Sequence, residues 1–250
     1  MQIRTLKVIA FLLLSVFWAK TSFGQETPGD STIRQASLGQ AVSNFYISIG
    51  QESRVYNGIE YHPYDRTIKG TALFPLDAET WATGKVTYDG ISYDGVPMMY
   101  DIYKDVLVAL LYNHFSMYIL QSNRVRDFSF SGHQFIRVNA DSLTNDRSGI
   151  STGFYEQLYK GKTMVLAKWV KTIQHSTSIT TVLETYFIEN HDYYLLKGNT
   201  YYKVNSKGAF LDVLKDKKPA LQKYLKDNHI NFRQDPATAM AILAAYYDRI

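Results

Sequence analysis

Short apolar runs separated by turn-forming residues fill the middle of the chain, between Gly84 and Val138. Such spacing is typical of an antiparallel meander, because each strand spans a few residues before the chain reverses. The turn-forming clusters are Asp89-Gly90, Asp94-Gly95, Tyr103-Lys104-Asp105, Tyr112-Asn113-His114, Gln121-Ser122-Asn123 and Ser131-Gly132-His133. The pattern predicts a β-rich core over these residues.

Two runs within the predicted meander indicate how its faces are covered. Val96, Met98, Tyr100 and Ile102 alternate with Pro97, Met99 and Asp101, which places the two sets on opposite faces of a strand. Pro97 favours a strand start or an edge. Residues 106–111 (VLVALL) are apolar at every position, so this run predicts a central strand that is covered on both faces.

The pattern divides the chain into two strand-rich halves, about 66–138 and 153–205, with a polar loop or boundary at 139–152. Within the first, residues 67–74 are a candidate for its first strand, and Phe115 begins an alternating, half-buried one. The second contains five apolar runs, at 154–159, 164–170, 182–188, 193–196 and 200–204. The long polar stretch 171–181 predicts an extended or disordered hairpin tip. Whether the two halves form one sheet or two stays open.

Helical periodicity appears at both ends of the folded part. From the possible cap Ser37, apolar residues recur at three- and four-residue spacing as far as Ile49, which predicts an N-terminal helix. Residues 209–214, 217–227 and 237–249 predict a C-terminal helical unit. Asp235-Pro236 marks the start of its last helix, because an acid at the cap followed by proline favours helix initiation.

Residues 1–24 have the features of a cleaved signal peptide. Arg4 and Lys7 precede the apolar run 8–19, and small residues follow at 22–24. The run is shorter than the ~18 residues that a membrane-spanning helix needs. Residues 25–36 predict a disordered leader, and residues 37–250 a single β-rich domain. We therefore expect an exported protein, periplasmic or extracellular, that is neither transmembrane nor lipid-anchored, since no cysteine follows the run.

Removing residues 1–24 lowers the net charge of the chain. The whole chain has 27 basic and 23 acidic residues. The removed segment contains three basic residues and no acids, so the mature chain has 27 − 3 = 24 basic residues and a net charge of 24 − 23 = +1. Its basic character is therefore no evidence for a nucleic-acid partner. The absence of cysteine excludes disulfides, thiol nucleophiles and thiolate metal sites.

Motifs for catalysis or metal binding are absent from the sequence. The six histidines are scattered and show no zinc-hydrolase spacing, and Asp89 and Asp94 are better explained by turns than by calcium. No nucleophile elbow or phosphate-binding glycine loop occurs. We therefore predict no catalytic residue, no metal and no cofactor. Paired strand carboxylates could still hydrolyse a glycoside, and the candidates are Asp101, Asp105, Glu156 and Glu184.

Aromatic residues are the most distinctive feature of the composition, with 20 tyrosines. Residues 55–65 crowd Tyr56, Tyr61 and Tyr64 around Asn57-Gly58 and Pro63, and Trp81 stands just before the meander. These four aromatic residues are the candidate ligand-binding residues, because exposed rings stack on ligands. The alternative, which we favour for the tyrosines, is that their rings pack the loop onto the sheet. We expect Tyr56 and Tyr61 to pack in this way and Tyr64 to be exposed.

Several short motifs together resemble a family of uncharacterised exported bacterial envelope proteins. They are Tyr56-Asn57-Gly58 with Glu60-Tyr61, the two YDG motifs at 88 and 93 followed by VPMMYD, Gly153-Phe154-Tyr155-Glu156, and a lysine-rich helix before the final Tyr-Tyr-Asp. The resemblance would cover most of the mature chain. It implies an envelope or extracellular location and supplies no catalytic residue.

The sequence thus predicts a β-rich α+β fold, with antiparallel meander sheet that can curve, an N-terminal helix and a C-terminal helical unit. For function it favours a non-enzymatic periplasmic or secreted binding or interaction module, whose partner is an unknown protein, glycan or apolar ligand of the envelope. The alternatives are a carrier of an apolar ligand in a curved-sheet cavity and a hydrolase that uses strand-end carboxylates.

Overall fold

The computed structural model describes residues 54–76, 81–111, 113, 115–143, 148–176 and 184–250, together with isolated residues between 33 and 49. The chain divides into two compact units, Met1–Ala41 and Val42–Ile250, and the fold concerns the second. The predicted signal peptide lies outside the described residues, as does nearly all of the predicted leader. The helix expected from Ser37 to Ile49 is not supported, and many of its residues also lie outside the described part.

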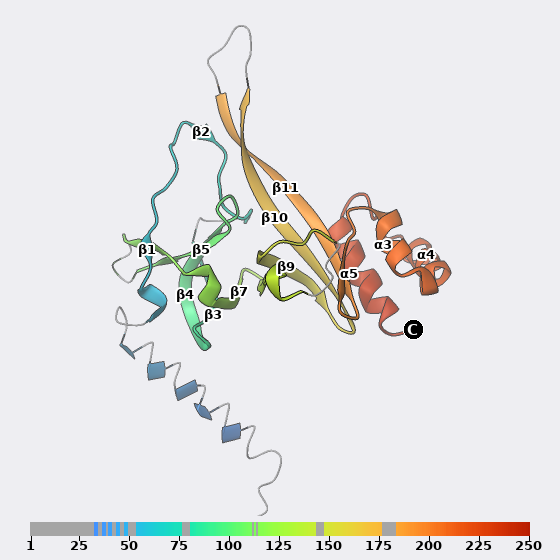
Figure 1. The fold of residues 1–250 in the computed structure, drawn as a ribbon, viewed down its shortest axis with the longest axis horizontal. Helices are drawn as coiled ribbons and strands as arrows, with labels where there is room; N and C mark the ends of the chain where they lie inside the picture. Colours follow the sequence, from blue (N-terminus) through green and yellow to red (C-terminus); the bar gives the residue numbers. More distant parts are fainter. Residues whose placement is uncertain are drawn as a thin grey trace, which may run out of the picture. The chain divides into compact units, whose positions relative to one another are not determined.

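Over the described residues the fold is β-rich, with a single large, mostly antiparallel sheet (Figure 1). Its strands are β1 (Ile59–Glu60), β2 (Ile68–Lys69), β3 (Ala82–Tyr88), β4 (Ile91–Asp101), β5 (Val106–Leu110), β6 (Met117–Ile119), β7 (Val125–Phe130), β8 (His133–Val138), β9 (Gly153–Lys160), β10 (Thr163–Ser176), β11 (Glu184–Lys197) and β12 (Thr200–Lys203). Their order is β1-β6-β5-β4-β3-β7-β8-β9-β10-β11-β12, and β2 pairs with β11 in parallel. The two halves therefore belong to one sheet, joined through β8 and β9.

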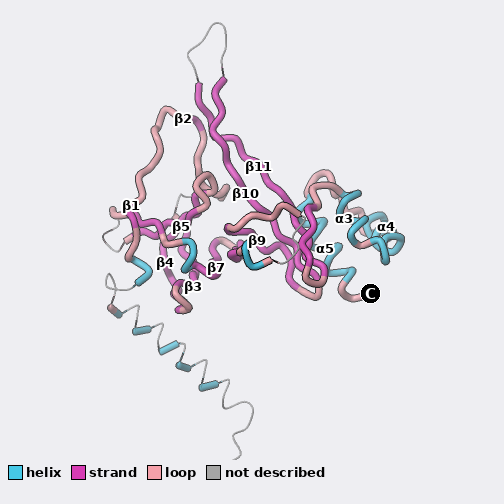
Figure 2. Tube along the Cα trace, viewed as in Figure 1, coloured by secondary structure: helices cyan, strands magenta, loops and turns pink. Residues whose placement is uncertain are grey.

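Three helices follow the last strand in sequence and lie together at the C-terminal end of the chain (Figure 2). They are α3 (Lys207–Val213), α4 (Lys218–Asp227) and α5 (Pro236–Tyr247), and the short 3₁₀ turns are Arg54–Tyr56, Ser122–Arg124, Ala140–Ser142 and Lys215–Lys217. Met240 and Leu243 of α5 are buried in one cluster with Val165 and Leu195 of the sheet. The C-terminal helical unit predicted from the sequence is thus confirmed, because its apolar stripe packs on the β10–β11 hairpin.

The N-terminal cap of α5 also agrees with the sequence prediction. The Asp235 side chain accepts a hydrogen bond from the Thr238 amide at 3.0 Å, and Pro236 occupies the first helical turn. Hydrogen bonds from Thr238 lower the pKa of Asp235 below its ordinary value. The carboxylate is therefore the form that the folded chain stabilises.

We expect Asp235→Ala to cost about 1 kcal/mol at neutral pH and Asp235→Asn much less, because asparagine caps a helix nearly as well. The lowered folded pKa means that the contribution of the charge is present above the unfolded pKa, about 3.9, and is lost as the pH falls through the folded pKa. Urea unfolding at pH 7 and at pH 3 measures both effects. An equal loss for the two substitutions at pH 7 would show that the cap does not act through hydrogen bonding.

Three details of the strands differ from the prediction. Asp94-Gly95 forms no turn but lies inside β4, where Gly95 has φ 72° and the pairing with β3 shifts register, so it is a bulge. Pro97 also lies within β4 and is tolerated because pairing with β5 begins only at Met98. Residues 184–197 form the single strand β11, with no turn between Ile188 and Tyr193.

The first half of the chain differs in two further places. Residues 67–74 contribute only the two-residue strand β2 and an isolated bridge between Leu73 and Asp101. Phe115 is 85 % exposed and lies outside β6, although its alternation with Met117 suggested a half-buried strand position.

The expectation that residues 106–111 form a central strand holds for β5, which pairs with β4 and β6. Leu107 and Val108 are both fully buried, and they belong to different clusters. Leu107 packs with the aromatic core of the first half, which includes Tyr100 and Phe128. Val108 packs on the opposite face with Tyr61 and Met99. The sheet is therefore covered on both faces at this strand, and the second face is where a pocket forms.

Candidate functional site

Residues 61–74, which we call the strap, form the cover of this second face. The strap leaves the end of β1, reaches β11 through β2 and returns to the end of β4 (Figure 1). Main-chain hydrogen bonds fix it at both ends: the Tyr61 amide donates to the Met117 carbonyl at 2.7 Å, and the Phe74 amide donates to the Tyr100 carbonyl at 2.8 Å. The middle is held by the pairing of β2 with β11. The strap is thus anchored at three separated points of the sheet.

A pocket of about 400 Å³ lies between the strap and the sheet. Most of its lining side chains are apolar or aromatic, and they come from the strap, β4, β6, β11 and the residue before β3. They are Tyr61, Pro63, Tyr64, Ile68, Ala72, Leu73, Trp81, Met99, Met117 and Phe187, with Asp65, Arg66, Gly70 and Thr71 completing the wall. This volume and composition are typical of a site for a small ligand or for one bulky group of a larger ligand.

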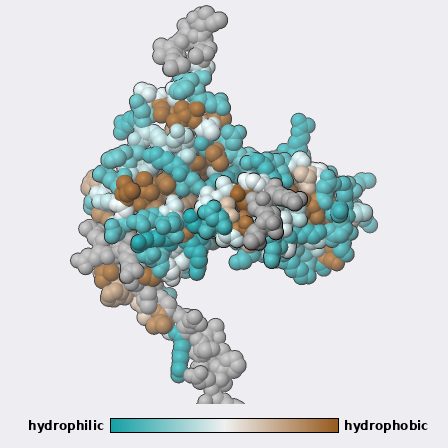
Figure 3. All heavy atoms as spheres, viewed as in Figure 1, coloured by the Kyte–Doolittle hydropathy of each residue, from teal (hydrophilic) through white to brown (hydrophobic). Residues whose placement is uncertain are grey.

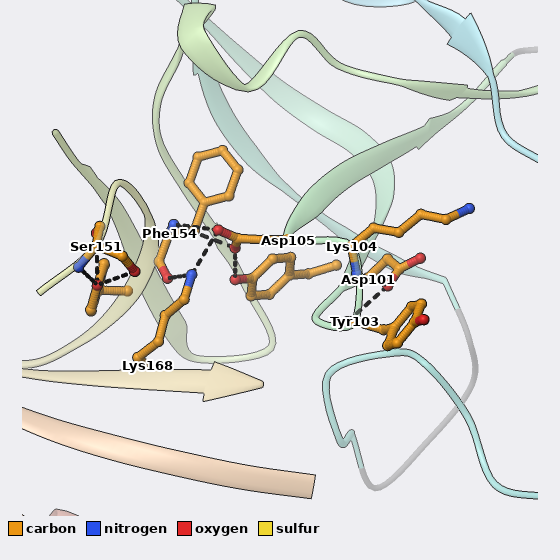
Figure 4. Close-up of polar contacts among 9 residues, drawn as sticks. Asp101, Tyr103, Lys104, Asp105, Ser151, Phe154 and Lys168 are labelled. Carbon is orange, nitrogen blue, oxygen red and sulfur yellow. Dashed lines mark hydrogen bonds and ion pairs between the residues drawn. The ribbon is translucent and has the colours of Figure 1, made fainter. Parts of the chain in front are cut away.

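A buried carboxylate holds the tyrosines of this pocket in place. Asp101, at the end of β4, is fully buried and accepts four hydrogen bonds. The hydroxyls of Tyr61 and Tyr64 donate to its Oδ2 at 3.1 and 2.8 Å. The amides of Tyr103 and Lys104, in the turn after β4, donate to its Oδ1, each at 2.9 Å. Figure 4 shows this turn. Asp101 therefore fixes both the strap and the turn after β4.

Burial and the neighbouring carboxylate act on these two tyrosines in the same direction. Burial, followed by the charge and hydrogen bonding of Asp101, raises the pKa of Tyr61 and the pKa of Tyr64 well above the ordinary value. Both hydroxyls therefore remain protonated and act as hydrogen-bond donors at every physiological pH. The pocket wall they form is neutral and apolar on its ring faces.

Aromatic rings pack edge to face at the β11 side of the pocket. The ring centroids of Tyr64, Tyr103 and Phe187 lie 5.2–5.6 Å apart in all three pairs, with interplanar angles of 73–82°. The Lys104 ammonium lies 4.6 Å from the centroid of the Tyr64 ring and 5.3 Å from that of Tyr61. These contacts stabilise the ring positions, and a preformed wall lowers the entropy cost of binding.

A second polar cluster, next to the turn after β4, joins the two halves of the sheet (Figure 4). The Lys168 ammonium donates to Asp105 Oδ2 at 2.7 Å and to the Phe154 carbonyl at 3.0 Å, and the Tyr100 hydroxyl donates to Asp105 Oδ1 at 2.5 Å. Burial lowers the pKa of Lys168, and Asp105 opposes this effect. A Cβ on Gly153 would lie 2.2 Å from Asp105 Oδ2, so only glycine permits this approach.

The strand carboxylates that could have served a hydrolase are each engaged in separate contacts. Asp101 and Asp105 bind the groups just described. Glu156 accepts from the Trp169 indole at 2.6 Å and lies 2.6 Å from His133 Nδ1. Glu184 contacts Lys69 and Tyr186. Each of these acids thus has hydrogen bonds or ion pairs of its own within the fold. Among the described residues, no cluster of three or more His, Asp or Glu could hold a metal ion.

Three of the four predicted ligand-binding residues, Tyr61, Tyr64 and Trp81, line the pocket. Tyr56 does not, because it packs in the core on the other face of the sheet. The expectation that Tyr56 and Tyr61 pack against the sheet is confirmed by exposures of 9 % and 4 %. The expectation that Tyr64 is exposed is wrong: the side chain is half-buried, and its hydroxyl donates to Asp101.

Sequence reasoning missed Asp101, Met99, Met117 and Phe187 as parts of this site. A signal existed for the first two, since the alternation around Pro97 places Met99 and Asp101 on one face. No such signal existed for Phe187, which reaches the pocket only because β2 pairs with β11.

We expect Tyr64→Phe to destabilise the fold by about 1–3 kcal/mol, since it removes one hydrogen bond to a buried charge. Tyr103→Phe is the matched control: its ring belongs to the same cluster, and its hydroxyl makes no hydrogen bond within the described part of the chain. Urea unfolding of both variants decides the point. Similar losses for the two would mean that the Tyr64–Asp101 bond contributes nothing.

Comparisons with protein-family models, with curated proteins and with solved structures find no match for this chain. The family resemblance drawn from the sequence motifs therefore stays a prediction. None of the described helices is long and apolar enough to cross a membrane.

Proposed function

We propose that this protein is a non-enzymatic binding module that holds an apolar or aromatic group of its ligand in the strap pocket. The observation that carries the proposal is the pocket itself: about 400 Å³, lined by Trp81, Phe187, two methionines and two tyrosines. Methionine and aromatic side chains together make an adaptable apolar wall. The hydrogen bonds to Asp101 fix the strap without the help of a ligand.

The surface around the pocket favours binding of one group in the pocket over binding through a broad contact surface. On the face drawn in Figure 3, hydrophobic residues lie in small patches separated by hydrophilic ones. A binding protein with such a surface gains most of its affinity where one apolar group is fully enclosed. The volume lies at the low end for small-molecule sites, which favours one group of a ligand over the whole of a lipid and so disfavours the carrier.

We further propose an exported protein, periplasmic or secreted, that meets its ligand in the cell envelope. The features that support export are the basic residues, apolar run and small residues of positions 1–24. Mass measurement of the protein from an envelope fraction tests this, since we expect the chain to start at or near Gln25. An intact Met1 there would contradict export with cleavage.

Methyl NMR with ¹³C-methionine labelling tests the pocket directly. Small aromatic and aliphatic fragments, such as indole, p-cresol and isopentanol, should shift the methyl signals of Met99 and Met117, which line the pocket. Met98 is the internal control, because it belongs to the same strand as Met99 but is buried on the opposite face. Phe187→Ala should weaken the fragment shifts by removing one wall.

Equal shifts at Met98 and Met99, or no shift with any fragment at millimolar concentration, would overturn the pocket as a binding site.

A further inference from the structure

The outer edge of β11 carries a short gap in the hydrogen bonding of the sheet. At one end, Thr185 and Tyr186 pair with β2. At the other end, residues from Tyr194 to Lys197 pair with β12. Within the part of the chain that the structure describes, no strand pairs with this edge between Phe187 and Tyr193. Glu189 and His191, in the middle of the gap, are exposed.

The direction of the main-chain groups in this gap follows from the pairing on either side. The Tyr193 carbonyl accepts from the Val204 amide and the Tyr193 amide donates to Asn205 Oδ1, both at 2.8 Å, so the main-chain groups of Tyr193 point outward. Main-chain groups alternate in direction along a strand. Those of Glu189 and His191 therefore also point outward, while those of Asn190 point to β10, its partner being Val170. Among the described residues, these two amides and two carbonyls have no strand to pair with.

The same strand contributes to the wall of the strap pocket. Phe187 is the first residue after the segment that pairs with β2, and its ring lines the pocket beside Tyr64. Directly opposite residues in neighbouring strands share a face of the sheet. Gly70 of the strap already lies beside Phe187. Glu189 is two residues further along and shares the face of Phe187, so a residue placed opposite Glu189 would present its side chain on the pocket side.

We propose that the ligand of this protein is an extended polypeptide segment, which pairs with the β11 edge at Glu189 and His191 and inserts one apolar or aromatic side chain into the strap pocket. The inference rests on the proposed function of the pocket and names the class of its ligand. Main-chain pairing supplies affinity and the pocket supplies selectivity, as in other cases of strand addition to a sheet edge. The role of β2 is consistent with this, because a two-residue segment already pairs with the same edge.

The length of the gap decides between a short segment and a second copy of the chain. From Phe187 to Tyr193 the edge offers about 20 Å, at ~3.4 Å for each residue. A second copy would bring its own β11 together with the β2 and β12 that flank it, and these would meet the β12 and β2 already present. A short strand or a chain terminus has no such flanking strands.

The probe is an array of N-acetylated, C-amidated pentapeptides. One position is Phe, Tyr, Trp, Leu or Met, and the others are drawn from Thr, Val, Lys and Glu. The tightest binder is then remade with a single N-methyl group at each amide in turn. Because only alternate amides of a paired strand face β11, methylation should weaken binding by about tenfold or more at every second position and little in between.

Amide hydrogen exchange reads the same contact from the protein side. Binding should slow exchange at Glu189 and His191. The Asn190 amide is the internal control, because it is paired with β10 in the free protein and should not change. Trp81→Ala should weaken peptides with a large aromatic residue and leave the alternating N-methyl pattern intact.

Four outcomes would overturn the inference, and they separate it from the pocket proposal. Peptide binding without the alternating N-methyl pattern would exclude strand addition and leave the pocket standing. Fragments that bind where no peptide does would exclude a polypeptide ligand only. Failure of fragments and peptides together would remove both proposals. Protection of Glu189 and His191 that grows with protein concentration, without peptide, would show that a second copy occupies the edge.

Discussion

Asp101→Ala should destabilise the fold by about 3–5 kcal/mol, because it leaves two tyrosine hydroxyls and two amides without their acceptor in a buried place. The loss should also release the strap, since Tyr61 and Tyr64 are joined to β4 through this carboxylate. Binding of fragments in the pocket should fall with it. Asp101→Asn should cost less, because the amide oxygen can still accept from the turn.

Asp94→Ala is the matched control for this substitution. Asp94 belongs to the same strand, is exposed, and forms an ion pair with Lys85, at 3.3 Å. A surface ion pair of this kind contributes little, so we expect a change within about 0.5 kcal/mol. Urea unfolding at pH 7 measures the three variants. A loss of less than 1 kcal/mol for Asp101→Ala would mean that water or a shifted strap replaces the carboxylate, and our account of the site would be wrong.

Local sequence pattern predicted the elements whose burial depends on neighbours in sequence. The alternation from Val96 to Ile102 places the correct side chains in the core, and the cap at Asp235 marks the start of α5. Both signals act within a few residues, where period and capping chemistry are decisive. The same is true of β5, whose unbroken apolar run reflects cover on both faces.

The failures arise where distant segments decide the outcome. The polar run from Glu189 to Asp192 suggested a break between two strands, yet it lies in the middle of β11. Its side chains are polar because this part of the hairpin is open to solvent, and a two-stranded arm needs no buried face there. Asp94-Gly95 has the composition of a turn but forms a bulge, because the pairing of β4 with β3 continues on either side of it.

The candidate site shows the same division. Tyr61, Tyr64 and Trp81 could be proposed from their aromatic character, whereas their grouping required the strap to cross the sheet and pair with β11. Tyr64 was expected to be exposed. It is half-buried instead, with a long-range hydrogen bond to Asp101, 37 residues away in sequence. Pairing of this kind has no local signature.

Cover on both faces of β5 predicts that two neighbouring substitutions should each be severely destabilising. Leu107→Ala opens a cavity in the aromatic core and should cost about 2–5 kcal/mol. Val108→Ala removes less volume, from the cluster with Tyr61 and Met99, and should cost roughly 1–3 kcal/mol. In a strand with one solvated face, only one of two consecutive positions would matter.

The control for these two substitutions is Phe115→Ala, which removes a larger side chain at a position that is 85 % exposed. We expect a change within about 0.5 kcal/mol there, so that the loss follows burial and not side-chain size. Val108→Ala should also broaden the Met99 methyl signal, because both side chains pack beneath the strap pocket, whereas Leu107→Ala should affect Met98. A negligible loss for Val108→Ala would mean that the strap does not cover this face in solution. The pocket between the strap and the sheet would then not form.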